Sequence, residues 1–229
     1  MKRSFFTAIC LLLISCLSMT AQVRDANFKR EMLLGVKAGI SIPNMAFSPV
    51  IQQNTWLGYT AGIAMRYTEE KIFGLIIEAN FTQRGWDEFF EYDPYQYRRV
   101  LNYVEIPFMT HIYFGSDKFR GFVNLGPQLG IMIGDTKSAN FDTQNLPSFS
   151  NPNTIKESYE LPIKNNIDYG ITGGLGAELR MDKHIFMIEG RYYFGLGDIF
   201  GNRKSDVFYG SSANRGFLVT LAYMFSVWK

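Results

Sequence analysis

The sequence predicts an all-β protein whose fold is an eight-stranded antiparallel up-and-down transmembrane β-barrel. Three observations lead to this prediction. Eight segments alternate between apolar and polar residues, as strands with two different faces do. The connections between these segments alternate between short and long. The 229 residues are 47% hydrophobic and 16% aromatic, with 21 glycines, yet beyond the N-terminus no run approaches the about 20 apolar residues of a membrane-spanning helix.

Each of the eight segments is long enough to cross a bilayer as a tilted strand of about 9–11 residues. In the fourth segment, LNYVEIPFMTHIYFG, strand geometry places Val104, Ile106 and Phe108 on one face. Glu105 and His111 then lie on the opposite, mixed face. The eight segments cover residues 33–42, 57–67, 72–84, 101–115, 121–133, 166–180, 185–197 and 216–228.

The connections fall into two length classes that alternate along the chain. A soluble β-sandwich has no reason to sort its loops in this way, whereas short turns at one end and long loops at the other are typical of outer-membrane barrels. The short connections are 68–71, 115–120 and 181–184, and the long ones are 43–56, 85–100, 134–165 and 198–215.

The composition of the two strand faces indicates which face points inward. Glycines and charges of both signs share one face, and large aliphatic residues occupy the other. The interior of an eight-stranded barrel has room only for side chains, so glycines and paired charges fit inside it. A soluble lipocalin-like barrel would reverse this arrangement. We therefore expect the apolar face to contact outer-membrane lipid, with both termini periplasmic and the long loops extracellular.

The N-terminus has the layout of a secretory signal peptide. Lys2 and Arg3 precede an apolar stretch over residues 4–17, and small and polar residues follow up to Ala21, where cleavage is expected. Lipidation at Cys16, the last residue of a lipobox-like Leu-Ile-Ser-Cys, is the alternative. The expected organisation is a signal peptide at 1–21, a short periplasmic leader at 22–31 and an outer-membrane barrel domain at 32–229.

Cleavage at Ala21 would leave a mature chain without cysteines and without net charge. Both cysteines precede this site, so no disulfide or cysteine metal site is expected. Loss of Lys2 and Arg3 lowers the number of basic residues from 23 to 21, equal to the 21 acidic residues. A neutral chain gives no reason to expect a nucleic-acid partner. No cofactor or metal ion is expected.

Four segments of the chain resemble the PorT-like outer-membrane β-barrel family. They are LNYVEIPFMTHIYFG, FVNLGPQLGIMIG, GVKAGISIPNM and IEGRYYFGLGDIF, and the most specific feature is Tyr-x-Glu-Ile-Pro at 103–107 followed by Gly-Pro-x-x-Gly at 126–130. The resemblance covers residues 32–228. The name-giving member of that family is required for protein export through the type IX secretion system, so the resemblance implies contacts with secretion components. One departure is Lys229, which follows Trp228 where such barrels commonly end in an aromatic residue.

Ten charged side chains are expected to point into the barrel lumen. They offer a proton path, a ligand site or a plug contact, or else an ion-pair network that fills the lumen, because a charge away from water needs a partner. We expect the network, and therefore no diffusion pore. Arg84 and Glu105, at the long-loop ends of neighbouring strands, are the preferred pair. The ten residues are Lys37, Arg66, Glu78, Arg84, Glu105, Asp168, Glu178, Arg180, Glu189 and Arg191.

The two histidines do not favour an enzyme. Outer-membrane hydrolases and acyltransferases usually need a histidine base near the reactive rim. His184 falls in a short turn and His111 near the short-turn end of its strand, away from every long loop. No catalytic residue is therefore expected.

The aromatic loop 85–99 is the candidate contact surface. Aromatic residues and arginine are enriched where proteins meet, although the same loop could instead pack over the barrel mouth. Loop 134–165 is long and polar, and is a second possible partner site. The expected function is an accessory of type IX secretion that acts through protein contacts, and the alternative is a stand-alone structural or ligand-binding barrel. The candidate contact residues are Trp86, Phe89, Phe90, Tyr92, Tyr95 and Tyr97.

Overall fold

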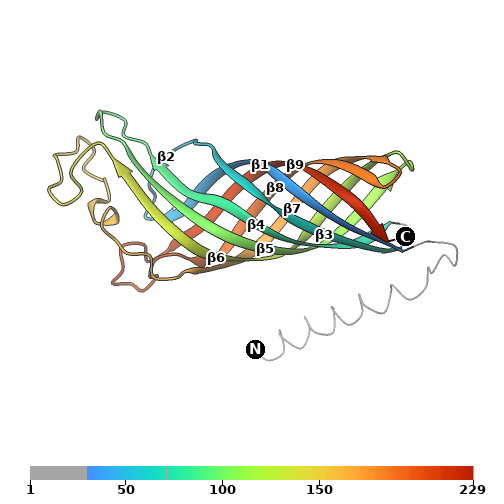
Figure 1. Ribbon diagram of the computed structural model, residues 1–229. Helices are drawn as coiled ribbons and strands as arrows, with labels where there is room; N and C mark the ends of the chain where they lie inside the picture. Colours follow the sequence, from blue (N-terminus) through green and yellow to red (C-terminus); the bar gives the residue numbers. More distant parts are fainter. Residues whose placement is uncertain (1–29, 71, 229) are drawn as a thin grey trace, which may run out of the picture.

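The computed structural model describes residues 30–70 and 72–228 (Figure 1). The predicted signal peptide at 1–21, its alternative lipidation site Cys16, and residues 22–29 of the predicted leader lie outside these described residues. The described residues form a barrel. Its first strand begins at Glu31, which is the last residue of the predicted leader.

Nine strands and one short 3-10 helix form the regular structure of the described chain. One strand, of two residues, lies within the first long connection. The elements are β1 (Glu31–Ser48), β2 (Gln53–Asn54), β3 (Gly58–Glu70), β4 (Phe73–Glu88), β5 (Tyr97–Gly115), β6 (Phe119–Ala139), the 3-10 helix η2 (Lys156–Ser158), β7 (Ile167–Met181), β8 (His184–Asp198) and β9 (Ser211–Trp228).

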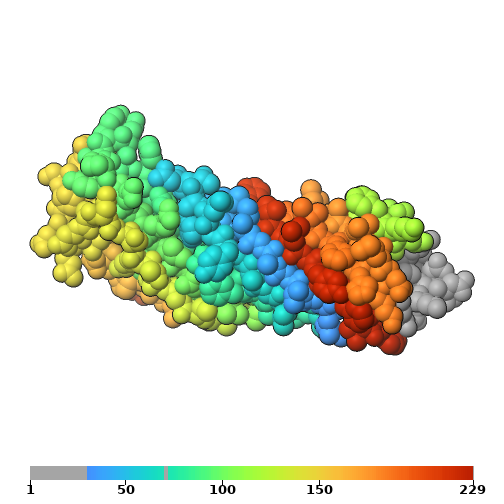
Figure 2. All heavy atoms as spheres, turned by 45° about the horizontal axis from the view of Figure 1, so that its top comes forward, coloured from blue at the N-terminus to red at the C-terminus, as the bar shows by residue number. Residues whose placement is uncertain are grey.

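Eight long antiparallel strands close into a ring. The strands pair in the order β4-β3-β1-β9-β8-β7-β6-β5, and β4 also pairs with β5, which completes the circle. The first and last strands are paired from Met32 and Trp228 at one end to Ser48 and Ser211 at the other. Figure 2 shows this seam as the blue strand beside the red one. The predicted fold class, an eight-stranded antiparallel up-and-down barrel, is confirmed.

Short turns gather at one end of the barrel and long connections at the other, as Figure 1 shows. We call these the short-turn end and the long-loop end. In the β5–β6 turn, Gly115 has φ +126, and an added Cβ would lie 2.6 Å from the carbonyl oxygen of Phe119. Glycine is therefore required to bring the two strands together there. No helix in the described ranges has the length and apolar character needed to span a membrane.

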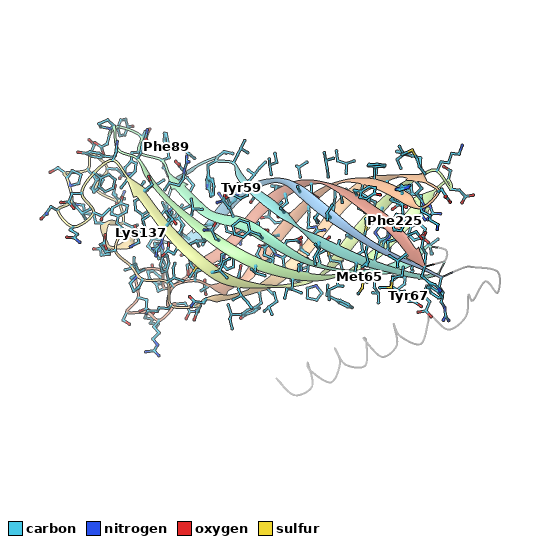
Figure 3. The ribbon with its side chains drawn as sticks, in the orientation of Figure 1. Tyr59, Met65, Tyr67, Phe89, Lys137 and Phe225 are labelled. Carbon is cyan, nitrogen blue, oxygen red and sulfur yellow. The ribbon has the colours of Figure 1, made fainter. Side chains whose placement is uncertain are left out.

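Large apolar side chains form a continuous belt on the outside of the barrel. Ile63 on β3, Leu175 on β7 and Leu221 on β9 are 62%, 68% and 65% exposed. The belt runs between Tyr59 and Tyr67 on β3, which Figure 3 shows toward the long-loop end and at the short-turn end respectively. Aromatic rings of this kind favour the boundary between lipid and water.

The strands continue past the belt, which corrects the predicted loop boundaries. Residues 43–48, 85–88, 97–100 and 134–139 were expected in long loops but belong to β1, β4, β5 and β6. The physical reason is that period-2 alternation persists there with its polarity reversed. On the outward face of β1, the apolar Ile40 is followed toward the long-loop end by the polar Asn44. On the inward face, the charged Lys37 is followed by the apolar Met45 and Phe47. Beyond the belt, toward the long-loop end, the outer surface of the strands meets water instead of lipid, so the apolar side chains point inward there.

A charge at the middle of the belt is expected to be far more costly than one beyond it. Ile63→Arg should lower the free energy of unfolding by about 2–4 kcal/mol, because an arginine there faces hydrocarbon. The measurement is the urea midpoint of the barrel folded into lipid vesicles. Asn44→Arg, on an exposed site of β1 beyond the belt, is the matched control and should change the midpoint little. Equal losses in both variants would contradict the assigned belt.

Candidate functional site

The centre of the lumen holds a buried four-residue ion cluster. Glu78 on β4 accepts hydrogen bonds from Lys37 Nζ at 3.0 Å and from Arg191 Nη1 at 2.9 Å. Arg191 Nη2 also donates to Glu189 Oε2 at 2.6 Å, and Lys37 Nζ lies 3.6 Å from the same carboxylate. Two cations thus balance two carboxylates. All four side chains are at most 6% exposed, so each depends on the others in place of water.

A second ionic group lies toward the short-turn end. Arg66 Nη1 donates to Glu178 Oε2 at 2.5 Å and contacts His111 Nε2 at 3.0 Å. Arginine has no acceptor, so His111 must accept at Nε2 and donate from Nδ1 to Asn124 Oδ1, 2.7 Å away. Asn124 in turn donates to Glu189 at 2.7 Å. His111 is therefore a bridge between the second ionic group and the central cluster.

Arg180 joins Glu178 to the start of the barrel. Its Nη1 lies 3.3 Å from Glu178 Oε1, and its Nη2 donates to Glu31 Oε2 at 2.5 Å. An apolar cluster shares the interior at this level, since Met187 and Ile185 pair in register with Glu178 and Arg180. Its buried residues are Leu33, Ala64, Tyr113, Phe122, Ile185, Met187 and Met224.

Toward the long-loop end, the structure places Arg84 beside Glu105, the pair preferred from the sequence. Arg84 Nε donates to Glu105 Oε1 at 2.7 Å, and both side chains are at most 5% exposed. We expected every charged side chain in the lumen to form an ion pair, and for Asp168 this expectation is wrong. Its Oδ2 accepts from Asn214 Nδ2 at 3.0 Å, and within the described part of the chain it forms no ion pair. Asn214 also donates to the hydroxyl of Tyr103 at 3.2 Å.

The lumen is filled by these side chains. A cavity beside the central cluster, lined by Lys37, Glu78, Asn124 and Glu189 among others, has a volume of about 10 Å³. One water molecule needs at least roughly 10–15 Å³.

Nine of the ten charged residues predicted to face the lumen lie in ion pairs with one another or with Glu31.

An apolar cap closes the long-loop end of the barrel. Phe47, Trp86 and Phe200 pack together, with ring centroids 4.9 Å apart for Phe47–Trp86 and 6.2 Å apart for Trp86–Phe200. The loops at 140–166 and 199–210 supply part of this cap. Its buried members are Met45, Phe47, Ile51, Trp86, Tyr97, Leu101, Tyr103, Tyr159, Ile199, Phe200 and Phe208.

Arg99 ties loop 140–166 to the barrel wall. Its guanidinium binds Asp135 through two hydrogen bonds of 2.8 and 2.5 Å, and Nη1 donates to the carbonyl of Leu161 at 2.8 Å. Sequence reasoning did not single out Arg99, Asp135 or Tyr159. Arg99 has the same strand parity as Glu105, which was the available signal for an inward side chain.

Tyr159 and Glu88 meet inside the cap, beyond the apolar belt. The hydroxyl of Tyr159 donates to Glu88 Oε1 at 3.2 Å. Burial, with the nearby Glu88 carboxylate, raises the pKa of Tyr159. Burial also raises the pKa of Glu88 from 4.5 to about 7, against the opposing effect of the Tyr159 hydrogen bond. The cap therefore contains a carboxyl group that is more easily accommodated when protonated.

The structure divides the predicted contact residues into two groups. Trp86 and Tyr97 are 1% exposed and point into the cap, which corrects their assignment to the contact surface. They belong to strand extensions whose inward face is apolar. Phe90 and Tyr95 are partly buried and pack on Phe149, with centroid distances of 5.7 and 5.4 Å. Loop 134–165, expected to be a polar partner site, thus contributes Phe149 and Tyr159 to packing.

Phe89 and Tyr92 remain on the surface, 43% and 73% exposed. Neither histidine lies near them, because His111 is buried in the lumen and His184 is at the short-turn end, bonded to the hydroxyl of Tyr223 at 2.7 Å. The described residues contain no cluster of histidine, cysteine and acidic side chains suited to a metal ion.

Removal of the carboxylate from the Arg84–Glu105 pair is expected to destabilise the barrel. Glu105→Ala leaves the Arg84 guanidinium buried without its counter-charge, and should lower the free energy of unfolding by about 3–5 kcal/mol. The urea midpoint of the refolded protein measures this. Arg98→Ala is the control, because Arg98 is 49% exposed in its pair with Asp87, and its loss should cost at most about 1 kcal/mol. A steady ion current through the wild type in planar bilayers, with selectivity altered in Glu105→Ala, would contradict the filled lumen.

The stability of the cap is expected to fall as pH rises. Glu88 has a pKa raised from 4.5 to about 7 in the folded protein. Its stabilising contribution is therefore complete below about pH 4.5 and is lost as pH rises through about 7. The melting temperature of the wild type should decrease between pH 5 and 8, and Glu88→Gln should remove that part of the decrease. An identical pH dependence in both proteins would show that Glu88 does not titrate in this range.

Solved structures of two other barrels are similar to this chain. Neisserial surface protein A is 9% identical, with 86% of this chain and 99% of that chain covered and a TM-score of 0.46. Outer Membrane Protein W of E. coli is 15% identical, with 87% and 99% covered and a TM-score of 0.43. No curated protein sequence matches the chain.

The family assignment comes from the sequence itself. The profile of the family described as "Outer membrane protein beta-barrel domain" matches residues 20–201, which span seven of the eight long strands. The apolar belt, the closed ring and the ionic lumen agree with a barrel whose outside faces lipid and whose inside does not. The chain belongs to the outer membrane protein beta-barrel domain family, and its place is the outer membrane.

Proposed function

We propose that this outer-membrane barrel is a non-enzymatic accessory of type IX protein secretion that works through protein contacts at its long-loop end. The observation that carries the proposal is a sealed lumen combined with an ordered cap that leaves aromatic side chains exposed. A filled barrel offers solutes no path, so its activity lies on its surfaces. The resemblance of LNYVEIPFMTHIYFG and its companion segments to the PorT-like family supports the choice of secretion. In the proposed orientation both termini are periplasmic and the long loops are extracellular.

The proposed contact surface is a groove of about 210 Å³ beside Phe89. Val50 and Phe89 line it, 77% and 43% exposed, and Glu91 and Asp93 add carboxylates along its edge. Asp93 is held in place by two hydrogen bonds from Ser150, of 2.9 and 2.7 Å. Exposed apolar groups beside acidic ones suit a partner segment that presents an apolar side chain next to a basic one.

Deletion of the gene in the source organism is expected to reduce export of proteins destined for the cell surface. Re-expression of the wild type should restore export, whereas Phe89→Ala should not, because it removes the exposed aromatic side chain that lines the groove, and a central aromatic contact is worth about 2 kcal/mol or more at an interface. The measurement is quantitative proteomics of the culture medium and cell surface.

Tyr209→Ala is the matched control, because Tyr209 is 57% exposed on another loop and does not line the groove. It should restore export fully. Unchanged export in the deletion strain would remove the secretion proposal. A sensitivity to detergents in that same strain would then favour the second candidate, a stand-alone barrel that stabilises the envelope.

A further inference from the structure

A second cleft lies on the outside of the barrel at the long-loop end of β7 and β8. Its volume is about 940 Å³, near the upper end of the range for small-molecule sites. Its lining includes three outward apolar or aromatic side chains and three polar ones, namely Ile167, Tyr169, Leu196, Asn166, Asn202 and Arg203.

The wall of the cleft that lies nearer the short-turn end, called the lower wall, belongs to the apolar belt. Ile167, Tyr169 and Leu196 point outward and are 61%, 54% and 53% exposed. Each is followed two residues along its strand, toward the short-turn end, by another outward belt residue, such as Ile171 or Phe194. The wall therefore continues into the surface that contacts acyl chains, and an occupant can enter sideways from the membrane.

The upper wall is polar and is held in shape by the protein alone. Asp198 Oδ2 accepts a hydrogen bond from Asn202 at 3.1 Å, and the carbonyl of Asp198 accepts one from Asn165 at 2.7 Å. Lys164 Nζ donates to Asp206 Oδ1 at 3.1 Å. A Cβ added to Gly201 would lie 2.2 Å from Asp206 Oδ2 and 2.5 Å from Lys164 Nζ, so a larger residue at position 201 would displace the ends of these two side chains.

The donors left over in this wall favour an anionic, hydroxyl-rich ligand. In the described part of the chain, both carboxylates of the cleft already accept hydrogen bonds, Asp198 from Asn202 and Asp206 from Lys164. The guanidinium of Arg203 and the carboxamide of Asn166, by contrast, make no hydrogen bond to the described residues. A guanidinium binds phosphate through two parallel hydrogen bonds, and a carboxamide serves sugar hydroxyls as both donor and acceptor.

We propose that this cleft binds a membrane lipid whose headgroup is a phosphorylated saccharide. The phosphate meets Arg203, the sugar hydroxyls meet Asn166 and Asn202, and the exposed ring of Tyr169 supports a sugar face. The acyl chains continue along Ile167 and Leu196. A soluble saccharide would leave this apolar wall without contact, and a phospholipid with a small headgroup would leave most of the polar wall unused. The inference goes beyond the proposed function, because it requires no protein partner.

The test is retention of a defined lipid by the full chain in detergent micelles, measured by native mass spectrometry. The probe is lipid A, a phosphorylated glucosamine disaccharide with acyl chains, compared with phosphatidylglycerol at equal concentration. We expect lipid A to be retained preferentially. Arg203→Glu should lower its retention about tenfold or more, the loss of a charge-assisted hydrogen bond converted to affinity. Lys204→Glu, a neighbouring exposed site outside the cleft, is the charge-matched control and should retain lipid A normally.

Two further arms identify the ligand chemistry. The wild type should retain lipid A stripped of phosphate more weakly than intact lipid A. The wild type and Arg203→Glu should retain this stripped lipid equally. Glucosamine 6-phosphate should not displace lipid A, because it lacks acyl chains. Asn166→Ala provides a second variant if Arg203→Glu loses the heat-modifiable migration of a folded barrel. Equal retention of phosphatidylglycerol, unchanged lipid A retention in the variants, or displacement by the free sugar phosphate would each overturn the proposal.

Discussion

Closure of the ring by the β1–β9 ladder is the constraint on which the rest of this structure depends. In lipid every backbone amide and carbonyl must find a partner within the protein, and a closed barrel achieves this without an edge. Eight strands, however, enclose a space only wide enough for side chains. The ladder crosses small inward residues such as Gly35 and Gly39, where an added Cβ would meet Met224 or Thr220 at less than 3.0 Å. Strand number thus decides that the inside is solid and that its charges must satisfy one another.

The change of surroundings along the strands explains how one chain builds two different interiors. Within the belt the outside is hydrocarbon, so the polar residues point inward and pair as ions. Beyond the belt the outside is aqueous, and Phe47, Trp86 and Leu101 point inward instead. The same strands therefore carry a membrane barrel with a polar interior and, above it, a cap with an apolar interior like that of a water-soluble protein. Arg99 lies within this cap, where its guanidinium is paired with Asp135 and its Cζ is 5.8 Å from the centre of the Trp86 ring.

Much of the fold was predictable from the sequence because strand parity is a local property. The face of Glu105 follows from its neighbours, and its pairing with Arg84 follows from the position of both at the ends of adjacent strands. Trp86 and Tyr97 were placed wrongly, because aromatic residues among acids look the same in a loop and in a strand whose polarity has reversed. The partner of Asp168 was not predictable either. Asn214 lies 46 residues later, on β9, which is separated from the strand of Asp168 by β8, and the contact therefore depends on the register of β8 with both of its neighbours.

The central ion cluster has a consequence for how this protein reaches its folded state. Glu78 on β4 is contacted by Lys37 from β1 and by Arg191 from β8, at sequence separations of 41 and 113 residues. Arg66 and Glu178 are 112 residues apart. Contacts this distant form late, after the entropy of closing the long intervening chain has been lost. A barrel that has not yet closed would expose unpaired charges to lipid, so the cluster makes insertion and closure one cooperative event and disfavours a half-formed sheet in the membrane.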